Sequence, residues 1–281
     1  MILPKFILTS RQNKIYSEFG LDCLAECYDK EHWRNYPYQV EYKFNSRGFR
    51  DAEWPDTIEE LQNCVWCFGD SITLGMGSPL EHTWTNILQS DIKKRCINIS
   101  LEGTSNKWIA RKIIEVLKVI SPKLIVVQWA YITRDEKNNN LLTDEDRRMV
   151  IDIDDLNKHV NQNYKLINTV ECEKNKSVII HYFGQTMFWN KHHIPDCWND
   201  VKGSSWPPVP TTISELESLD NKIINELHQF KLYDLIRNYI MLSNNIKYVP
   251  EIVQLDKARD GHHYDKLTAE KFVGNIVSLI K

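Results

Sequence analysis

The hydrophobic positions of the chain change their spacing several times after residue 57, and each change marks an expected element. Residues 64–68 (CVWCF) form a continuous apolar run, which is typical of a strand buried on both faces. Other short apolar runs predict further strands, and apolar residues three or four positions apart predict helices between them. The expected strands are 96–100, 124–130 and 177–184, and the expected helices lie within 84–92, 109–120, 151–170, 216–240 and 267–280.

The order strand, helix, strand, helix, strand is typical of a parallel sheet that helices cover on both faces. We therefore expect the α/β class, as a three-layer α/β/α sandwich with about five parallel strands in flavodoxin-like order. The 281 residues are enough for one large domain of this kind. Residues 1–60 show no periodic core, so we expect them to pack as an N-terminal extension on the domain formed by residues 61–281.

One connection, residues 185–212, is too long for a plain loop in a compact domain. It leaves the carboxyl end of an expected strand and contains Trp189, Trp198 and Trp206. Flat indole rings suit stacking on sugar rings, which makes these tryptophans candidate substrate contacts. The alternative is that they anchor an irregular loop to the body of the protein.

Composition and charge argue against several classes of function. A net charge of −3 provides no basic field that would hold nucleic acid by its phosphates. The longest apolar run, residues 124–132, is too short to span a bilayer, and the first residues, MILPKFIL, lack the pattern of a secretory signal. We expect a soluble, cytoplasmic protein that binds neither nucleic acid nor a membrane.

The seven cysteines show neither a disulfide framework nor the spacing of a metal site. Cys64 and Cys67 are three residues apart on an expected strand, so their side chains face opposite sides. Cys23 and Cys27 suit one face of a helix, but no second pair completes a zinc site. We expect reduced thiols and no bound metal.

The first expected strand ends in the sequence Gly-Asp-Ser, whose serine is Ser71. Catalytic groups gather at this carboxyl edge of open parallel sheets, and a serine nucleophile needs a base and a group that orients the base. Near the end of the chain, Asp260 precedes His263 by three residues in a glycine-containing turn. From there the carboxylate can reach Nδ1 and leave Nε2 facing a hydroxyl; an exposed Asp-Gly turn is the alternative.

The pairing of FGDSITLG with the later ARDGHHYD resembles the SGNH hydrolases, also called GDSL-type esterases, over roughly residues 63–281. The resemblance implies that Ser71 is the nucleophile, His263 the general base and Asp260 its partner. It also implies two-step acyl transfer that needs no metal or organic cofactor. The glycine that follows the second strand in the family matches Gly103, so the N–H groups of Ser71 and Gly103 would bind the oxyanion.

The third motif of that family, Gly-x-Asn-Asp, is altered in this chain. The segment QWAYITRDE places Ala130, Ile132 and Thr133 where the family has glycine, asparagine and aspartate. Isoleucine donates no hydrogen bond, and loss of one oxyanion donor typically lowers turnover roughly 10²–10³-fold. Asn106 is the first candidate for a replacement donor, and Thr133 and Arg134 are the alternatives.

These features predict a serine esterase of the carboxylic ester hydrolase class, which removes an acyl group, expected to be acetyl, from a carbohydrate or another small ester. The family acts on lipids, thioesters and acetylated sugars, so the fold does not choose the substrate. The rival hypothesis is a weakly active or inactive carbohydrate-binding or structural module, which the altered third motif favours. A nucleotide-binding domain is disfavoured because the glycines after the first strand do not follow G-x-G-x-x-G.

Overall fold

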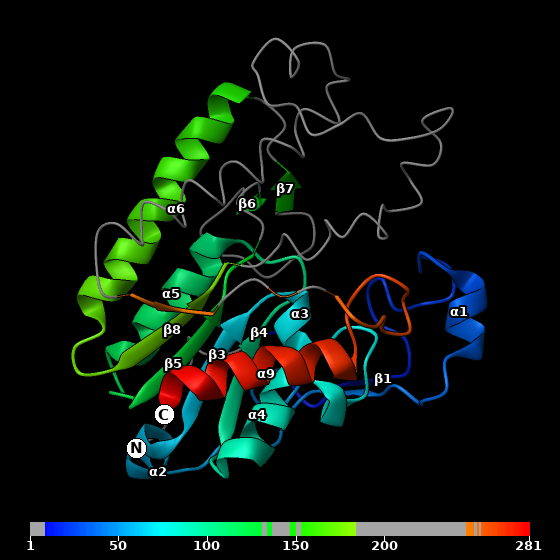
Figure 1. Ribbon diagram of the computed structural model, residues 1–281, viewed down its shortest axis with the longest axis horizontal. Coiled ribbons are helices and arrows are strands. Elements are labelled where there is room, and N and C mark those ends of the chain that lie inside the picture. Colours follow the sequence, from blue (N-terminus) through cyan, green and yellow to red (C-terminus); the bar gives the residue numbers. More distant parts are fainter. Residues whose placement is uncertain are drawn as a thin grey trace.

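A computed structural model, shown in Figure 1, describes residues 9–130, 134–136, 147–149, 153–183, 246–249, 252 and 254–281 of the protein. The helix expected within 216–240 lies outside the described residues. None of the helices in the described ranges is long and apolar enough to cross a membrane.

A five-stranded parallel sheet forms the centre of the described structure (Figure 1). The strands are β3 (Val65–Gly69), β4 (Cys96–Ser100), β5 (Leu124–Gln128), β8 (Val178–Tyr182) and β9 (Lys247–Tyr248). They lie side by side in the order β4-β3-β5-β8-β9, and each neighbouring pair is parallel. In chain order this is the 2-1-3-4-5 arrangement of flavodoxin-like sheets, so the predicted fold class is confirmed.

Helices cover both faces of the sheet and complete the three layers (Figure 1). One pair packs together on the first face and another pair packs together on the second. The first pair is α5 (Asn106–Leu117) and α6 (Ile153–Glu173), and the second is α4 (Trp84–Ile92) and α9 (Lys266–Ile280).

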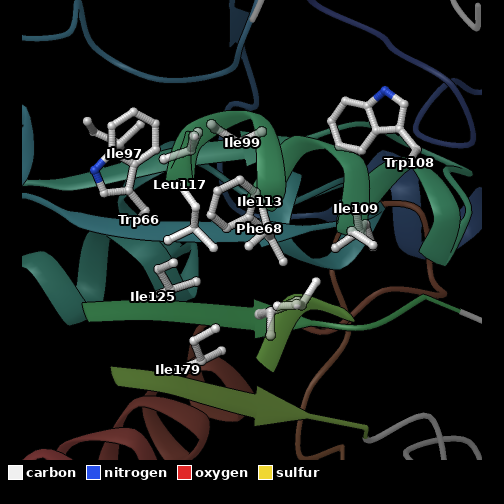
Figure 2. Packing of buried hydrophobic residues seen from close by; sticks show 14 of the residues in the cluster. Trp66, Phe68, Ile97, Ile99, Trp108, Ile109, Ile113, Leu117, Ile125 and Ile179 are labelled. Atoms are coloured by element: carbon white, nitrogen blue, oxygen red, sulfur yellow. The ribbon is translucent and has the colours of Figure 1, made fainter. Parts of the chain in front are cut away.

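The alternation of side chains along β3 explains why both faces are covered. Trp66 and Phe68 belong to the apolar cluster under α5 and α6, part of which Figure 2 shows. Val65 and Cys67 belong to the cluster under α4 and α9. Cys64 lies in the first cluster, so Cys64 and Cys67 face opposite sides of the sheet, as predicted. Each large apolar side chain buried in this way contributes roughly 1.5–3 kcal/mol to folding.

Short elements surround this sandwich. Before β3 come β1 (Ile15–Tyr16) and β2 (Tyr42–Lys43), which pair antiparallel, α1 (Lys30–Asn35) and α2 (Ile58–Asn63). After β3 come α3 (Ser71–Leu74) and the 3-10 helix η1 (Leu80–His82), and after β5 the antiparallel pair β6 (Arg134–Glu136) and β7 (Arg147–Met149).

The N-terminal extension shares its apolar core with the α/β domain. Its small cluster of buried side chains includes Tyr42 and Phe44, but it also includes Leu74 from the end of α3 and Met76 just after it. A core completed by residues of the main domain is consistent with an extension that depends on that domain. That residues 1–60 do not fold alone stays a prediction.

Charged residues of the extension also brace two loops at the carboxyl edge of the sheet. The buried guanidinium of Arg50 donates a hydrogen bond of 2.8 Å to the backbone oxygen of Ser78, in the loop after β3. Arg11 forms an ion pair with Glu102, in the loop after β4. The extension therefore helps to fix the loop that follows the helix of Ser71 and the loop that contains Gly103.

Candidate active site

Ser71 is the first residue of α3, directly beyond the carboxyl end of β3. Asp70 caps this short helix, because its Oδ1 accepts a hydrogen bond of 3.0 Å from the N–H of Ile72. Gly75 ends the helix with a φ of 76°, a left-handed conformation that favours glycine. β3 lies between β4 and β5, at the point of the sheet where the chain connections diverge and ligands usually bind.

Gln128 at the end of β5 holds this strand-to-helix turn in place. Its Oε1 accepts hydrogen bonds from the N–H of Asp70 at 3.2 Å and from Oγ1 of Thr73 at 3.0 Å. A Cβ atom at position 69 would lie 2.0 Å from Oγ1 of Thr73 and 2.6 Å from Oε1 of Gln128. Gly69 is therefore required for the turn that presents Ser71.

Ser71, His263 and Asp260 form a continuous chain of hydrogen bonds. Oγ of Ser71 lies 2.8 Å from Nε2 of His263, and Nδ1 of His263 lies 2.5 Å from Oδ2 of Asp260. All three side chains are buried, and Asp260 is fully inaccessible. The predicted contacts among the three residues are thus present in the structure, in the arrangement that lets a histidine accept a proton from a serine hydroxyl.

The carboxylate of Asp260 is held in its charged form. Burial alone would raise the pKa of Asp260. The charge of His263 and the hydrogen bonds that the carboxylate accepts lower the pKa by more than burial raises it, so the net pKa lies below its ordinary value. Oδ1 accepts hydrogen bonds from the N–H groups of His262 at 2.9 Å and His263 at 3.0 Å. A charged Asp260 donates no proton, so Nδ1 of His263 is the donor in this contact, and in the neutral ring Nε2 is then the acceptor.

His262 lies beside the hydrogen-bonded chain rather than in it. Its ring contacts the ring of His263 edge to face, with centroids 4.9 Å apart. Burial and the neighbouring charge of His263 lower the pKa of His262 to about 3. The ring is therefore neutral near pH 7, and Nε2 of His263, not a ring atom of His262, is the nitrogen that faces Oγ of Ser71.

The lowered pKa of His262 predicts a pH dependence of stability. In the unfolded chain a histidine takes up a proton below about pH 6.5, whereas the folded protein resists this uptake until about pH 3. The contribution of the neutral His262 ring to the unfolding free energy is thus fully present above about pH 6.5 and is lost as the pH falls toward 3. We expect His262→Gln to reduce the slope of unfolding free energy against pH, between pH 6.5 and 4, by up to about 1.4 kcal/mol per pH unit. Urea unfolding at several pH values measures it, and an unchanged slope in the variant would contradict the assignment.

The N–H groups of Ser71 and Gly103 are the predicted oxyanion donors. Within the described part of the chain, neither the N–H of Ser71 nor that of Gly103 has a hydrogen-bond acceptor. Gly103 adopts a φ of 61° in the loop after β4, and β4 pairs with β3 through Gly69 and Ser100. The two loops leave the same edge of the sheet from neighbouring strands, and that their N–H groups bind an oxyanion together stays a prediction.

The prediction that Asn106 replaces the missing oxyanion donor is wrong. One N–H of its side-chain amide donates to the backbone oxygen of Ala130 at 2.9 Å, and Nδ2 also donates to Oδ1 of Asn163 at 2.6 Å. Its Oδ1 accepts a hydrogen bond of 2.7 Å from the N–H of Ala130. The amide is thus used to tie the start of α5 to the end of β5 and to α6, and both of its hydrogens are engaged.

Arg134 is the alternative candidate that does lie near the nucleophile. Its Nη1 forms an ion pair of 2.7 Å with Oδ2 of the fully buried Asp70, which directly precedes Ser71. Its charge also contributes to lowering the pKa of His262. The sequence left open a surface pairing with the neighbouring acidic residues; in the structure Arg134 pairs with the carboxylate of the Gly-Asp-Ser motif. Ile132 and Thr133 lie outside the described residues.

Comparisons with known proteins give matches only among solved structures. No protein-family model and no curated protein matches the chain. Similar structures include TesA (13% identity, TM-score 0.47, 78% of this chain and 98% of that chain) and the lipase/acylhydrolase from Enterococcus faecalis (14%, 0.45, 78% and 95%). Another is a family two carbohydrate esterase from Clostridium thermocellum in complex with cellohexaose (12%, 0.46, 82% and 66%). At these identities and TM-scores the likeness decides neither family nor activity, so the site must be interpreted from its own residues.

Two further expectations concern the three tryptophans of the long connection and a metal site. Trp189, Trp198 and Trp206 lie outside the described residues. Among the residues that are described, no group of three or more His, Cys, Asp or Glu side chains is arranged to hold a metal ion.

Sequence reasoning missed two residues at this edge of the sheet. Gln128 carried a signal, because a polar residue that ends an apolar strand is often placed there for a specific contact. Tyr28 carried none, because nothing in its local sequence relates it to the histidines near the end of the chain. In the structure its ring stacks on His262, with centroids 4.6 Å apart.

Proposed function

We propose that the protein is a serine esterase that transfers the acyl group of a small ester, expected to be an acetyl ester of a carbohydrate, to Ser71 and then to water. The observation that carries this proposal is the hydrogen-bonded chain from Ser71 through His263 to Asp260. Catalytic serine, histidine and carboxylate groups act together in this order.

In the first step Oγ of Ser71 attacks the ester carbonyl carbon while its proton passes to Nε2 of His263. The negative charge of Asp260 stabilises the imidazolium that forms. The carbonyl oxygen becomes an oxyanion, which the N–H groups of Ser71 and Gly103 bind. His263 then gives its proton to the leaving alcohol oxygen as the bond between that oxygen and the carbonyl carbon breaks, and the acyl group remains on Ser71.

In the second step water attacks the acyl-serine. His263 accepts a proton from the water, the same two N–H groups hold the second oxyanion, and the proton returns to Oγ of Ser71 as the acid leaves. Every proton transfer in both steps uses Nε2 of His263.

The positive charge of Arg134 is proposed to compensate in part for the missing asparagine. A guanidinium held by Asp70, next to Ser71, stabilises the negative charge that develops on the carbonyl oxygen without having to touch it. The charge is fixed in place before the reaction, so no reorganisation is needed at the transition state.

We expect Arg134→Gln to lower kcat roughly 10²-fold with little change in KM, because the charge acts on the transition state rather than on the bound ester. Arg134→Lys, which keeps the charge, should retain most of the activity. Arg95→Gln is the matched control, since it breaks a similar ion pair of 2.7 Å, with Asp51, beside the amino end of β4. Equal losses of kcat in Arg134→Gln and Arg95→Gln would mean that Arg134 acts only through stability.

A carbohydrate-binding or structural module is the second candidate function. It is favoured because both amide hydrogens of Asn106 are donated to other acceptors. The Asn106 amide therefore does not replace the oxyanion donor that the altered third motif lacks. Hydrolysis of ethyl acetate, methyl 6-O-acetyl-glucopyranoside and ethyl decanoate by the unmutated protein separates the candidates. The esterase predicts turnover of both acetyl esters and slower turnover of the decanoate. Absence of turnover with all three favours the module.

A further inference from the structure

The segment that contains Tyr28 is fixed against the loop that carries Asp260 and His263. The N–H of Tyr28 donates a hydrogen bond of 3.1 Å to the backbone oxygen of Asp260. Four residues later, Nε2 of His32 lies 2.9 Å from the backbone oxygen of Ala258. These contacts hold the N-terminal extension against the start of the catalytic turn.

Further contacts make this arrangement specific. Asp22 forms two hydrogen bonds with Arg259, at 2.8 and 2.7 Å, so the extension is also paired by charge with this loop. Gly261 has a φ of 74°, and a Cβ atom there would lie 3.1 Å from Cβ of Asp29. The close approach of the two segments thus depends on glycine at position 261.

Tyr28 continues a row of packed rings that begins at the general base. The rings of His263 and His262 meet edge to face, and the rings of His262 and Tyr28 stack at an interplanar angle of 21° with centroids 4.6 Å apart. His262 is neutral at neutral pH, because its pKa is about 3, so the stack carries no charge that would have to be desolvated. Despite these contacts Tyr28 is 47% exposed, which is high for an aromatic residue fixed on both backbone and ring.

The chemistry of the site decides which part of an ester lies beside this row of rings. The acyl carbonyl must face Oγ of Ser71 and the N–H groups of Ser71 and Gly103. The leaving alcohol oxygen must lie within hydrogen-bonding reach of Nε2 of His263, since this nitrogen protonates it. The alcohol portion of the ester therefore leaves the reaction centre on the side of His263, and the next rings beyond His263 are those of His262 and Tyr28.

We propose that Tyr28 is a specificity-determining residue, whose exposed ring binds the sugar ring of the alcohol portion of the ester by stacking. This inference rests on the proposed esterase function and adds a substrate contact from the N-terminal extension. The apolar C–H face of a pyranose is complementary to the face of a tyrosine ring, and a ring held in advance loses little entropy on binding. Ring-free alcohols gain nothing from this contact.

Kinetics of Tyr28 variants test the proposal. For methyl 6-O-acetyl-glucopyranoside, we expect Tyr28→Ala to raise KM roughly tenfold, whereas Tyr28→Phe keeps KM within about twofold, since stacking needs the ring and not the hydroxyl. For ethyl acetate, which has no ring, kcat/KM should stay unchanged in both variants. Tyr38→Ala is the matched control, because Tyr38 is 49% exposed but contacts His82 instead of the catalytic turn. Equal losses on the two esters in Tyr28→Ala would overturn the proposal.

A binding measurement separates this proposal from the esterase function itself. In the Ser71→Ala background, saturation-transfer NMR with methyl 6-O-acetyl-glucopyranoside reports contact with the ligand without any turnover. We expect the sugar ring protons to receive saturation, to lose most of it in Tyr28→Ala and to keep it in Tyr28→Phe. If the unmutated protein hydrolyses no ester but this pattern holds, the esterase function fails and only the contact of Tyr28 with the sugar ring stands. Saturation that is unaffected by Tyr28→Ala would overturn the role of Tyr28 even in an active enzyme.

Discussion

Replacing Ser71 by alanine is expected to lower kcat for acetyl esters by roughly 10⁶-fold. The reason is that Oγ of Ser71, 2.8 Å from Nε2 of His263, is the atom to which the acyl group would be transferred. Without it, His263 and the oxyanion donors have no nucleophile to assist. The fold should persist, since the substitution removes one hydrogen bond, whose net contribution to stability is about 1 kcal/mol.

The matched control for this variant is Ser78→Ala. Ser78 is a buried serine in the loop after α3, and its Oγ donates a hydrogen bond of 3.3 Å to the backbone oxygen of Tyr264. The Ser78→Ala variant also loses a buried serine hydroxyl in this region of the chain, but its kcat should stay within a few fold of the unmutated value. Steady-state hydrolysis of ethyl acetate and urea unfolding of both variants provide the comparison. A Ser71→Ala protein that keeps more than about one hundredth of the turnover would exclude Ser71 as the nucleophile.

Asp260→Asn is expected to lower kcat by roughly 10⁴-fold while leaving the loop in place. Oδ1 of Asp260 accepts two backbone hydrogen bonds, from His262 and His263, so an asparagine would keep its oxygen there. Its NH₂ group would then occupy the position of Oδ2, facing Nδ1 of His263. Nδ1 would have to accept that hydrogen bond, and the proton of the imidazole would move to Nε2. In this tautomer His263 cannot accept the proton of Ser71.

The same variant has a signature in its stability at acid pH. The pKa of Asp260 in the folded protein lies below its ordinary value, so its contribution to stability is fully present above about pH 4 and is lost as the pH falls through the folded pKa. Asparagine does not titrate, so this acid-dependent loss should be absent from Asp260→Asn. Urea unfolding between pH 5 and 3 measures it.

Asp51→Asn provides the contrasting control. Asp51 is also buried, but burial raises its pKa to about 6 despite its ion pair with Arg95, so its charged form destabilises the folded protein above that pH. It lies beside the amino end of β4, and kcat should be unchanged in this variant. Turnover of Asp260→Asn within tenfold of the unmutated protein would contradict the orienting role of Asp260.

The layered fold could be predicted from the sequence because its signals are local. The continuous apolar run of β3 and the helical spacing of α5 and α9 reflect burial, which each segment records in its own residues. The two-residue strand β9 could not be found in this way, since it is too short for any periodic pattern to develop. Its place at the edge of the sheet is decided by pairing with β8.

The candidate site also contains contacts that the local sequence predicts and contacts that it does not. Asp260 and His263 are three residues apart, so the turn between them is enough to bring carboxylate and imidazole together, and the sequence predicted their contact. Ser71 and His263 are 192 residues apart, and their pairing followed from the rule that parallel strands end at one edge and from the resemblance of both motifs to one family. Asn106 was assigned wrongly because the sequence shows an available amide but not the atoms that already engage it.

Long-range contacts decided the remaining features of the site. The ion pair of Arg134 with Asp70 joins residues 64 positions apart, and the stack of Tyr28 on His262 joins the two ends of the chain. By itself, the sequence determined which segments are buried, which turns are tight and which side chains can perform chemistry, because these depend on neighbours within a few residues. Only the tertiary structure decided which of those side chains meet and which are already engaged, because packing of distant segments sets the distances between them.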